Sequence, residues 1–560
     1  METALVALGT LDEQGRPWTT IWGGERGFAQ PVAQGVLGFN SGVDTKYDPV
    51  YEALWKETDG AGGMVRPNGG EGKLMSALSI DLESRDRVKL AGLMMAGSAE
   101  EKSVQMAMLV TESLGNCPKY LNKKRVSKKD VASESAVNGL PLSKEAMELI
   151  ARSDMFFMSS TNGETMDTNH RGGPVGFIRV VSNDENEVAL VYPEYSGNRL
   201  YQTLGNLKMN PAVGVVIPDY ETSDVLYLTG TASILVGDEA WSILSRTNLA
   251  VKITVKDARF VKGGLPFQGT RLDDSPYNPP VRRLLSERDP NVVNPFERQN
   301  KMTANMIKRE VLTPTINRFT FKLVSDDGKK LAWHAGQHLT LDFDMELGNG
   351  YAHMNDDDPQ SLNEDFIRTF TISSPPLDDK DVTEAELQIT MRKNGRATGF
   401  LWRHNERVPL ELPVLGFGGE STFRMPTTAQ EAKKPVFVAG GVGVTPLLAQ
   451  AKAVLAGNVG LQVLWSISKF DVPLVVDAFK RIEGLAAVTS VFITGGNGDA
   501  EVKQLQELGV KAAEARRMDQ GDVDGLKGET KFYLCAGEGL LKRLREWLDG
   551  QDVVWEDFGY

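Results

Sequence analysis

The sequence has few cysteines, scattered histidines and no excess of basic residues. Its two cysteines, Cys117 and Cys535, cannot form a disulfide framework or a four-thiolate iron-sulfur cluster, so a built-in ferredoxin module is excluded. A reducing, cytoplasmic compartment fits best. The formal net charge of -13 argues against a nucleic-acid surface, because neutralising phosphates requires clustered Lys and Arg. The five histidines occur singly, so we expect no metal site.

Long apolar runs are also missing. A membrane-spanning helix needs about 20 consecutive apolar residues, whereas the longest candidate, 435–457, is broken by a glycine turn and by Gln450. We therefore expect a soluble chain whose partners are small molecules or a redox partner. Met1 precedes the apolar residues 4–8 without a basic segment, which argues against a secretory signal. A shortened amino terminus is the alternative, because a barrel strand rarely begins at residue 4.

Two short motifs in the second half combine a cation, hydroxyls and glycine. The segment 368–374 reads Arg-Thr-Phe-Thr-Ile-Ser-Ser on an expected strand, and Arg368 can hold a diphosphate with two parallel hydrogen bonds. The segment 394–400 is expected to open a helix, where free backbone N-H groups attract phosphate. Gly395 lets the backbone approach closely. These motifs favour one dinucleotide site.

Two further motifs each follow an apolar strand. The turn 439–446, Ala-Gly-Gly-Val-Gly-Val-Thr-Pro, joins an expected strand to an expected helix, as phosphate-binding turns do. The segment 533–540 places Cys535 at the carboxyl end of a strand, where ligands of open α/β sheets bind. We therefore expect a second dinucleotide site, with Cys535 facing the nicotinamide.

Together the four motifs resemble the ferredoxin-NADP reductase superfamily over roughly residues 304–560. The resemblance implies an antiparallel FAD-binding barrel followed by a Rossmann-like domain. It also implies FAD contacts from Arg368, Thr369, Phe370, Thr371, Gly395 and Thr398. The implied NAD(P) contacts are Gly440, Gly441, Gly443, Thr445, Pro446, Lys469, Cys535 and Gly537, with Lys469 favouring NADPH. Thr371, Cys535 and Glu556 are the catalytic candidates. Phe370 replaces the commoner Tyr, which keeps ring stacking and removes one hydroxyl.

The first half suggests an internal duplication of a β-rich unit. Residues 4–22 read as strand, tight turn and strand, and the same pattern returns at 155–176. The segment 76–92 likewise parallels 214–230. We expect two copies of one fold within this half.

The second copy resembles the FMN-binding split barrel of the pyridoxamine 5'-phosphate oxidase superfamily. The resemblance rests on Ser196-Gly-Asn-Arg-Leu200, Asn206-Leu207 and Asn210-Pro-Ala-Val213, and covers residues 4 to about 261. It implies that Arg199 at a helix start binds the FMN phosphate. Gly197 and Asn198 would shape the turn, and His170 and Arg171 would lie near the flavin. Since only this copy carries the motif, we expect one FMN; Lys46 of the other copy serves a second phosphate or nothing. Family members are homodimers, so the duplicated chain is expected to be a monomer with an internal pseudo-dimer or a homodimer.

These interpretations divide the chain into five parts. They are a first split-barrel copy (1–140), a second, FMN-type copy (141–265), a Pro-rich connection (266–303), an FAD-binding β-barrel (304–428) and an NAD(P)-binding α/β domain (429–560). The segment 344–365 is acidic and is expected to be irregular. Within it, Asp356-Asp-Asp358 is expected to be a solvated loop; the alternatives are that it repels anionic acceptors or docks a basic partner.

The predicted function is an NAD(P)H-dependent flavin oxidoreductase. Hydride passes from NAD(P)H to FAD, and electrons continue to FMN or to another acceptor at the first half. Two alternatives remain open: a reductase with FAD alone, whose first half binds a substrate or partner, and a non-catalytic flavin-binding protein. The acceptor is not identified by the sequence.

Overall fold

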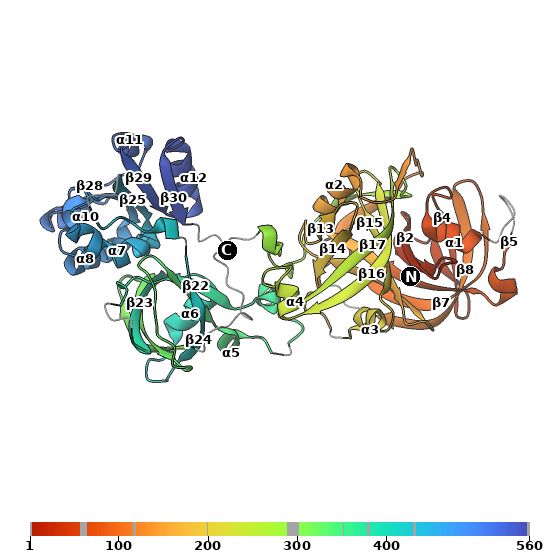
Figure 1. Ribbon diagram of the computed structural model, residues 1–560. Coiled ribbons are helices and arrows are strands. Elements are labelled where there is room, and N and C mark those ends of the chain that lie inside the picture. The colour runs from red at the N-terminus through yellow and green to blue at the C-terminus, as the bar shows by residue number, and fades with distance from the viewer. Residues whose placement is uncertain are drawn as a thin grey trace. The chain divides into compact units, whose positions relative to one another are not determined.

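The computed structural model describes residues 3–56, 64–115, 119–198, 200–287, 302–350, 352–377, 381–419, 421–428 and 433–556. The chain forms two compact units. Unit 1 contains residues 1–288 together with 349–364, and unit 2 contains 289–348 together with 365–560. Figure 1 labels their main elements. Among the described residues, no helix is both long enough and apolar enough to cross a bilayer.

Unit 1 contains two antiparallel sheets of eight strands each. The first sheet has the strand order β2-β1-β6-β7-β8-β4-β3, with β5 paired to β7. Its strands are β1 (Leu5–Leu11), β2 (Pro17–Gly23), β3 (Ala29–Ala33), β4 (Val36–Gly42), β5 (Met64–Val65), β6 (Lys73–Ile80), β7 (Arg87–Ala99) and β8 (Ser103–Gly115). The expected first hairpin is present, and Gly15 adopts the positive φ of 72° that its turn requires.

The second sheet has the order β12-β11-β15-β16-β17-β14-β13, with β10 paired to β17. Its strands are β10 (Ala136–Asn138), β11 (Met155–Thr161), β12 (Met166–Gly172), β13 (Arg179–Asn183), β14 (Val188–Pro193), β15 (Ala212–Pro218), β16 (Val225–Val236) and β17 (Leu249–Val261). When each strand is replaced by its counterpart, the seven-strand path is the same as in the first sheet.

Short helices complete unit 1. They are α1 (Pro49–Trp55), α2 (Lys144–Arg152), α3 (Gln202–Met209) and α4 (Asp238–Trp241), with 3-10 turns η1 (Pro67–Gly70) and η2 (Leu285–Glu287). α1 follows β4 and α3 follows β14, so the two helices hold equivalent places in the two sheets. α1 begins with Asp48, whose side chain accepts hydrogen bonds from the backbone N-H groups of Val50 and Tyr51.

Two segments that were expected to be irregular, the connection after residue 265 and the acidic segment before β22, fold onto unit 1. The first part of the expected connection forms β18 (Phe267–Arg271), which pairs with β9 (Lys124–Lys128). The acidic segment 349–364 belongs to unit 1 and contains the turn η3 (Pro359–Asn363). Polar side chains of this segment, such as Asn363 and Gln360, bond to other parts of the unit, which composition alone does not indicate. Asp356 and Asp357 are exposed, as a solvated loop requires.

Unit 2 begins with an antiparallel sheet of order β22-β21-β24-β19-β20-β23. A bridge between Ile372 and Ile389 joins its two edge strands, so the sheet curls toward a closed barrel. The elements are β19 (Met302–Val311), β20 (Ile316–Ser325), β21 (His338–Asp342), α5 (Asp344–Leu347), β22 (Ile367–Thr371), β23 (Glu384–Arg392), α6 (Gly395–Arg403), β24 (Glu411–Gly418) and η4 (Ser421–Phe423).

The rest of unit 2 is a parallel sheet of order β28-β27-β26-β25-β29-β30 with helices on both faces (Figure 1). Its strands are β25 (Lys434–Gly440), β26 (Gln462–Ser468), β27 (Thr489–Thr494), β28 (Ala512–Glu514), β29 (Thr530–Cys535) and β30 (Asp552–Glu556). The helices are α7 (Thr445–Ala456), α8 (Val472–Arg481), α9 (Leu485–Val488), α10 (Asp499–Glu507), α11 (Gln520–Asp524) and α12 (Glu538–Trp547), with 3-10 turns η5 (Gly441–Val444) and η6 (Lys469–Asp471). The strand order reverses between β25 and β29, and such a reversal opens a crevice at the carboxyl ends of the strands.

Candidate functional site

The four motifs of the second half line one cavity of about 520 Å³ in unit 2, here called the unit 2 cavity. β22 contributes its last four residues, and α6 presents its amino-terminal turn. β25 and β29 end at the same cavity, at the point where the strand order reverses. The predicted residues that line it are Arg368, Thr369, Phe370, Thr371, Gly395, Thr398, Gly440, Gly443, Thr445 and Gly537.

Two glycines explain why the backbone can approach a ligand here. Gly395 has a φ of 73°, and a Cβ at this position would meet no atom within 4 Å, so the backbone faces open space at the start of α6. Gly443 lies in the opposite situation, because a Cβ would come within 2.2 Å of the carbonyl oxygen of Cys535. The turn after β25 therefore packs directly against the end of β29, which fixes the floor of the cavity.

The β22 side chains are held in different ways. Arg368 donates to the backbone oxygen of Ile367 at 2.8 Å and lies 3.5 Å from the carboxylate of Asp365. Phe370 and Thr371 are both 7% exposed, and Phe370 packs edge-on against Phe343. This strand thus presents a cation, a ring and a hydroxyl to one space.

Not all predicted residues reach this cavity. Cys535 is fully buried, and burial raises the pKa of its thiol well above the ordinary value, with Glu556 adding to the effect. Cys535 therefore lies as a neutral thiol behind Gly443 rather than on the cavity surface. Glu556 is its register partner on β30. Gly441 and Pro446 are likewise absent from the lining, and Lys469 lies over the ring of Phe470, 3.5 Å from a Cβ built on Gly496.

One further cation lines the unit 2 cavity and was not predicted. Arg392, the last residue of β23, bonds to Asp471 at 2.5 Å and to the hydroxyl of Thr315 at 2.7 Å. Asp471 is 2% exposed and also accepts from the hydroxyl of Thr313 at 2.9 Å. Because Asp471 opens α8 of the parallel sheet, this network fastens the antiparallel sheet to it. A lone arginine at a strand end gave no sequence signal for this role.

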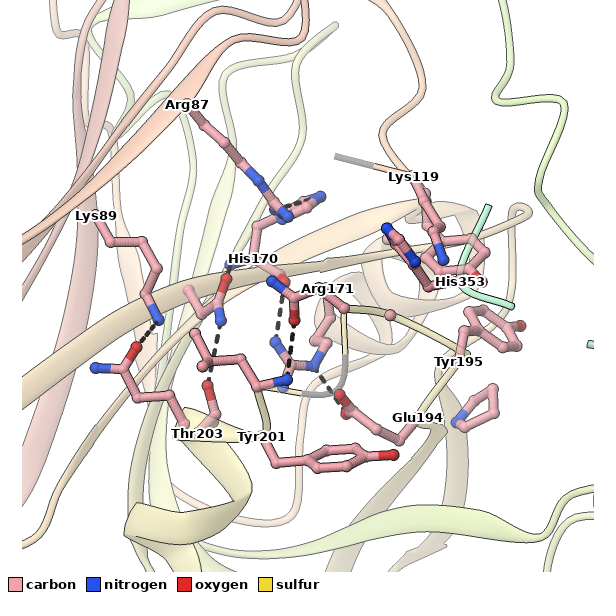
Figure 2. A pocket seen from close by; sticks show the side chains of 18 of the residues that line it. Arg87, Lys89, Lys119, His170, Arg171, Glu194, Tyr195, Tyr201, Thr203 and His353 are labelled. Carbon is pink, nitrogen blue, oxygen red and sulfur yellow. Dashed lines mark hydrogen bonds and ion pairs between the residues drawn. The ribbon is translucent and has the colours of Figure 1, made fainter. Parts of the chain in front are cut away.

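Unit 1 contains a second candidate site, here called the basic cavity (Figure 2). Four cationic side chains line it, and Glu194 is the one carboxylate among its described lining residues. The cations come from both sheets and from the segment between them: Arg87 and Lys89 on β7, Lys119, and Arg171 on β12. His170, Gly197 and Asn198, all predicted for FMN, also line it, whereas Arg199 lies outside the described residues.

The centre of the basic cavity is a contact between the two sheets. A guanidinium N-H of Arg87 donates to Nδ1 of His170, as Figure 2 shows. Burial lowers the pKa of His170 well below its ordinary value, and the charges of Arg87 and Arg171 lower it further. A neutral imidazole is the form that can accept from Arg87. Arg171 is oriented by Glu194, whose Oε2 lies 2.8 Å from its Nε.

Lys89 also lines a neighbouring cavity of about 590 Å³. Its ammonium group forms a buried ion pair with Asp167 and donates to Oε1 of Gln202 at 2.7 Å. Lys89, Leu200 and Gln202 line both cavities. The neighbouring cavity has a mixed lining, with apolar side chains such as Leu114 and Met166 beside the carboxyl groups of Glu112 and Asp167.

The contribution of the first sheet was not predicted from the sequence. Arg87 and Lys89 lie within the segment 76–92 that the repeat singled out, but alternating charges on a strand normally face solvent. The hydroxyl of Tyr195 is a further lining group, and its oxygen is buried with no hydrogen-bond partner among the residues that the structure describes. Burial raises the pKa of Tyr195, so the phenol remains a donor. An unsatisfied buried donor beside cations indicates a site for an anion or another acceptor.

Comparison with known proteins gives a partial likeness. No family model matches the chain. It is 25% identical over 308 residues to nitrate reductase (NADPH) of Neurospora crassa, a match that covers 50% of this chain and 29% of that protein. The chain therefore spans less than a third of the length of this relative. Among solved structures, it is similar to phthalate dioxygenase reductase, with 17% identity, coverage of 47% of this chain and 70% of that one, and a TM-score of 0.32. It is also similar to a ferredoxin NADP+ reductase from Neisseria gonorrhoeae with bound FAD and NADP, with 13% identity, coverage of 46% and 98%, and a TM-score of 0.28.

Proposed function

We propose that the chain is an NAD(P)H-dependent flavin oxidoreductase that binds FAD in unit 2 and FMN in unit 1. The observation that carries the proposal is the meeting of four separate sequence motifs in the unit 2 cavity. The match to nitrate reductase (NADPH) supports it. The acceptor of the electrons is a small molecule or a redox partner.

The residues of the unit 2 cavity fit FAD. The Arg368 guanidinium would hold the diphosphate together with the backbone N-H groups that start α6, where Gly395 leaves open space. Phe370 would pack on the flavin, and the Thr371 hydroxyl is the candidate donor to it. FAD, when bound, would take up hydride from NAD(P)H and release electrons singly. The protein's contribution is to hold the two rings in contact, since hydride transfer depends on positioning.

The nicotinamide nucleotide would bind where β25 and β29 end. Gly440, Gly443 and Thr445 form the turn before α7, and Gly537 precedes α12, so two helix amino termini with their free N-H groups face the cavity. Lys469 lies beside Gly495 and Gly496, at the carboxyl end of β27. It is the candidate for a 2'-phosphate, which favours NADPH. Cys535 would support the turn from behind.

We further propose that unit 1 is a duplicated split barrel with an internal pseudo-twofold axis. Gly9, Thr19 and Ser76 are register neighbours in the first sheet, and Ser159, Thr168 and Gly214 hold the matching places in the second. The two sheets make the same contact twice, with the roles of the two copies exchanged. Thr19 of the first copy bonds to the backbone oxygen of Gly214 in the second at 2.9 Å. Its counterpart Thr168 in the second copy bonds to the hydroxyl of Ser76, the counterpart of Gly214, at 2.6 Å.

The same register explains why one FMN site is proposed rather than two. Counting from these pairs, Arg87 and Lys89 correspond to Val225 and Tyr227 of β16, and His170 and Arg171 correspond to Ile21 and Trp22 of β2. All four counterparts are at most 1% exposed. Each position that is basic in one copy is apolar or aromatic in the other.

A buried carboxyl group also disfavours phosphate in the counterpart site. Asp48 is 3% exposed and accepts hydrogen bonds from Thr20 at 2.6 Å and from Trp22 at 2.8 Å. Lys46, the alternative phosphate ligand, lies over the ring of Tyr47. The counterpart site has become packed core.

In the basic cavity the FMN phosphate would contact cations, and the ring would lie toward Lys89, which also lines the neighbouring cavity. Arg87 and Lys119 are the described cations best placed for the phosphate, with the α3 amino terminus at Gln202 adding a favourable dipole. Arg199 remains a sequence-based candidate for the same role.

Flavin analysis of paired variants tests this proposal. Chromatography of the released flavins should give equal amounts of FAD and FMN from the natural chain. Arg368→Ala should lose FAD and keep FMN, whereas Arg87→Met and Arg199→Ala should lose FMN and keep FAD. A natural chain that contains FAD alone would favour the alternative in which unit 1 binds a substrate or partner. Flavin that NADPH and NADH both fail to reduce would favour a non-catalytic protein.

A further inference from the structure

We propose that residues 349–364, which lie in sequence between strands β21 and β22 of unit 2, form a fixed wall of the basic cavity and that His353 contacts the anionic end of its ligand. The inference rests on the proposed function, because it takes FMN as the ligand. It gives His353 a role in selecting the ligand and gives the segment a role in building the cavity wall. The acidic composition of the segment indicates neither role.

The 349–364 segment is attached to unit 1 through Asn363. The side-chain oxygen of Asn363 accepts from the backbone N-H of Ser196 at 2.9 Å, and its amide donates to the Tyr120 hydroxyl at 2.8 Å. Its backbone oxygen accepts from Arg282. The Tyr120 hydroxyl in turn donates to the backbone oxygen of Ser196 at 2.7 Å. Since Tyr120 lines the basic cavity, this attachment lies directly against the cavity wall.

A second set of bonds fixes the rest of the segment. Asp356 accepts from the hydroxyl of Tyr277, and Gln360 donates to the backbone oxygen of Pro276 at 2.6 Å. Within the segment, the amide of Asn355 donates to the hydroxyl of Ser361 at 2.9 Å. The segment is therefore a folded element with its own internal bonds.

This attachment delivers His353 and Met354 to the basic cavity. Figure 2 shows His353 in the part of the cavity where Lys119 and Tyr195 lie. Lys119 donates to the backbone oxygen of Ser196 at 3.1 Å, so the cation and the segment share one attachment point. An imidazole N-H, an ammonium group and the buried Tyr195 hydroxyl are all donors. Their shared chemistry suits a phosphate monoester, because bonds from donors to an anion are stronger than those to the neutral acceptors of a flavin without phosphate.

Affinity for FMN compared with riboflavin tests the inference in the full-length protein. His353→Leu, which has no donor, should weaken FMN about three- to tenfold, the effect of losing one exposed donor to an anion. It should leave riboflavin affinity and the FAD content unchanged. Asp357→Asn is the matched control, because Asp357 is an exposed residue of the same segment outside the cavity lining. Asn363→Ala should weaken FMN in the same direction, through loss of the attachment.

The outcomes separate this inference from the function on which it rests. If the natural chain binds FMN tightly and His353→Leu binds it as well as Asp357→Asn does, the role of His353 is refuted and the FMN site stands. If His353→Leu weakens FMN and riboflavin equally, the phosphate contact is refuted. If the natural chain binds no FMN, the unit 1 part of the proposed function fails and this inference fails with it.

Discussion

The substitution Gly443→Ala probes the packing that supports the nucleotide turn. A Cβ at this position would lie 2.2 Å from the carbonyl oxygen of Cys535, 2.8 Å from its carbonyl carbon and 3.2 Å from its sulfur. The nearest atoms are backbone, so the turn and β29 have to separate by about 1 Å. Overpacking of a well-packed interior costs typically 1–3 kcal/mol, and a backbone clash belongs near the upper end, at about 3 kcal/mol.

That cost has two measurable consequences. For a unit of roughly 250 residues, about 3 kcal/mol lowers the melting temperature by about 6–12 °C, which the release of flavin fluorescence on heating would record. Stopped-flow reduction should show weaker binding of NAD(P)H, because the displaced turn no longer presents its N-H groups correctly. Gly399→Ala is the matched control, since its Cβ would meet only the Arg403 side chain at 3.6 Å. It should stabilise α6 by about 0.5–1 kcal/mol. Equal melting temperatures for the two variants would refute the packing argument.

Three other substitutions have expected results that follow from the same contacts. Lys89→Met should lower the free energy of unfolding of unit 1 by about 3–5 kcal/mol in urea, because it leaves Asp167 buried without its cation. The second substitution Asp167→Asn should recover most of that stability, and no recovery would contradict the ion pair between Lys89 and Asp167. Lys469→Ala should raise the KM for NADPH about tenfold and leave that for NADH unchanged, and equal effects on both would remove Lys469 from nucleotide selection. Cys535→Ala should slow flavin reduction several-fold without loss of FAD, through weaker support of the turn at Gly443, and an unaltered stopped-flow rate would reduce Cys535 to packing.

Local patterns predicted the backbone of the unit 2 motifs, because each motif depends on a local backbone requirement; the roles of their residues stay predictions. The diphosphate-type turn needs glycine between a strand and a helix, and residues 439–446 are found in that arrangement. The burial of Cys535 was not predictable, because the local sequence is the same whether a thiol at a strand end faces a cavity or lies behind a glycine. Arg392 depends on Asp471, 79 residues away, and such pairs leave no local pattern.

In unit 1 the sequence predicted two similar β-rich parts, and two sheets with the same strand order are present, but it did not indicate which sheet supplies which cation. His170 and Arg171 were predicted from the second copy, whereas Arg87 and Lys89 come from the first, because the cavity lies where two equivalent sheets meet. The pairing of Lys89 with Asp167 depends on that packing and not on spacing along the chain. The attachment of residues 349–364 to unit 1 was not predictable for the same reason, since its partners are distant in sequence.

The most direct test of the central claim is an anaerobic titration of the purified chain with NADPH, followed by absorbance at the flavin band. A chain that holds FAD and FMN in electronic communication should require about two hydride equivalents per chain for complete bleaching. Both released flavins should then be found in equal amounts. Complete bleaching after about one equivalent, with FAD as the single flavin recovered, would contradict the two-flavin account.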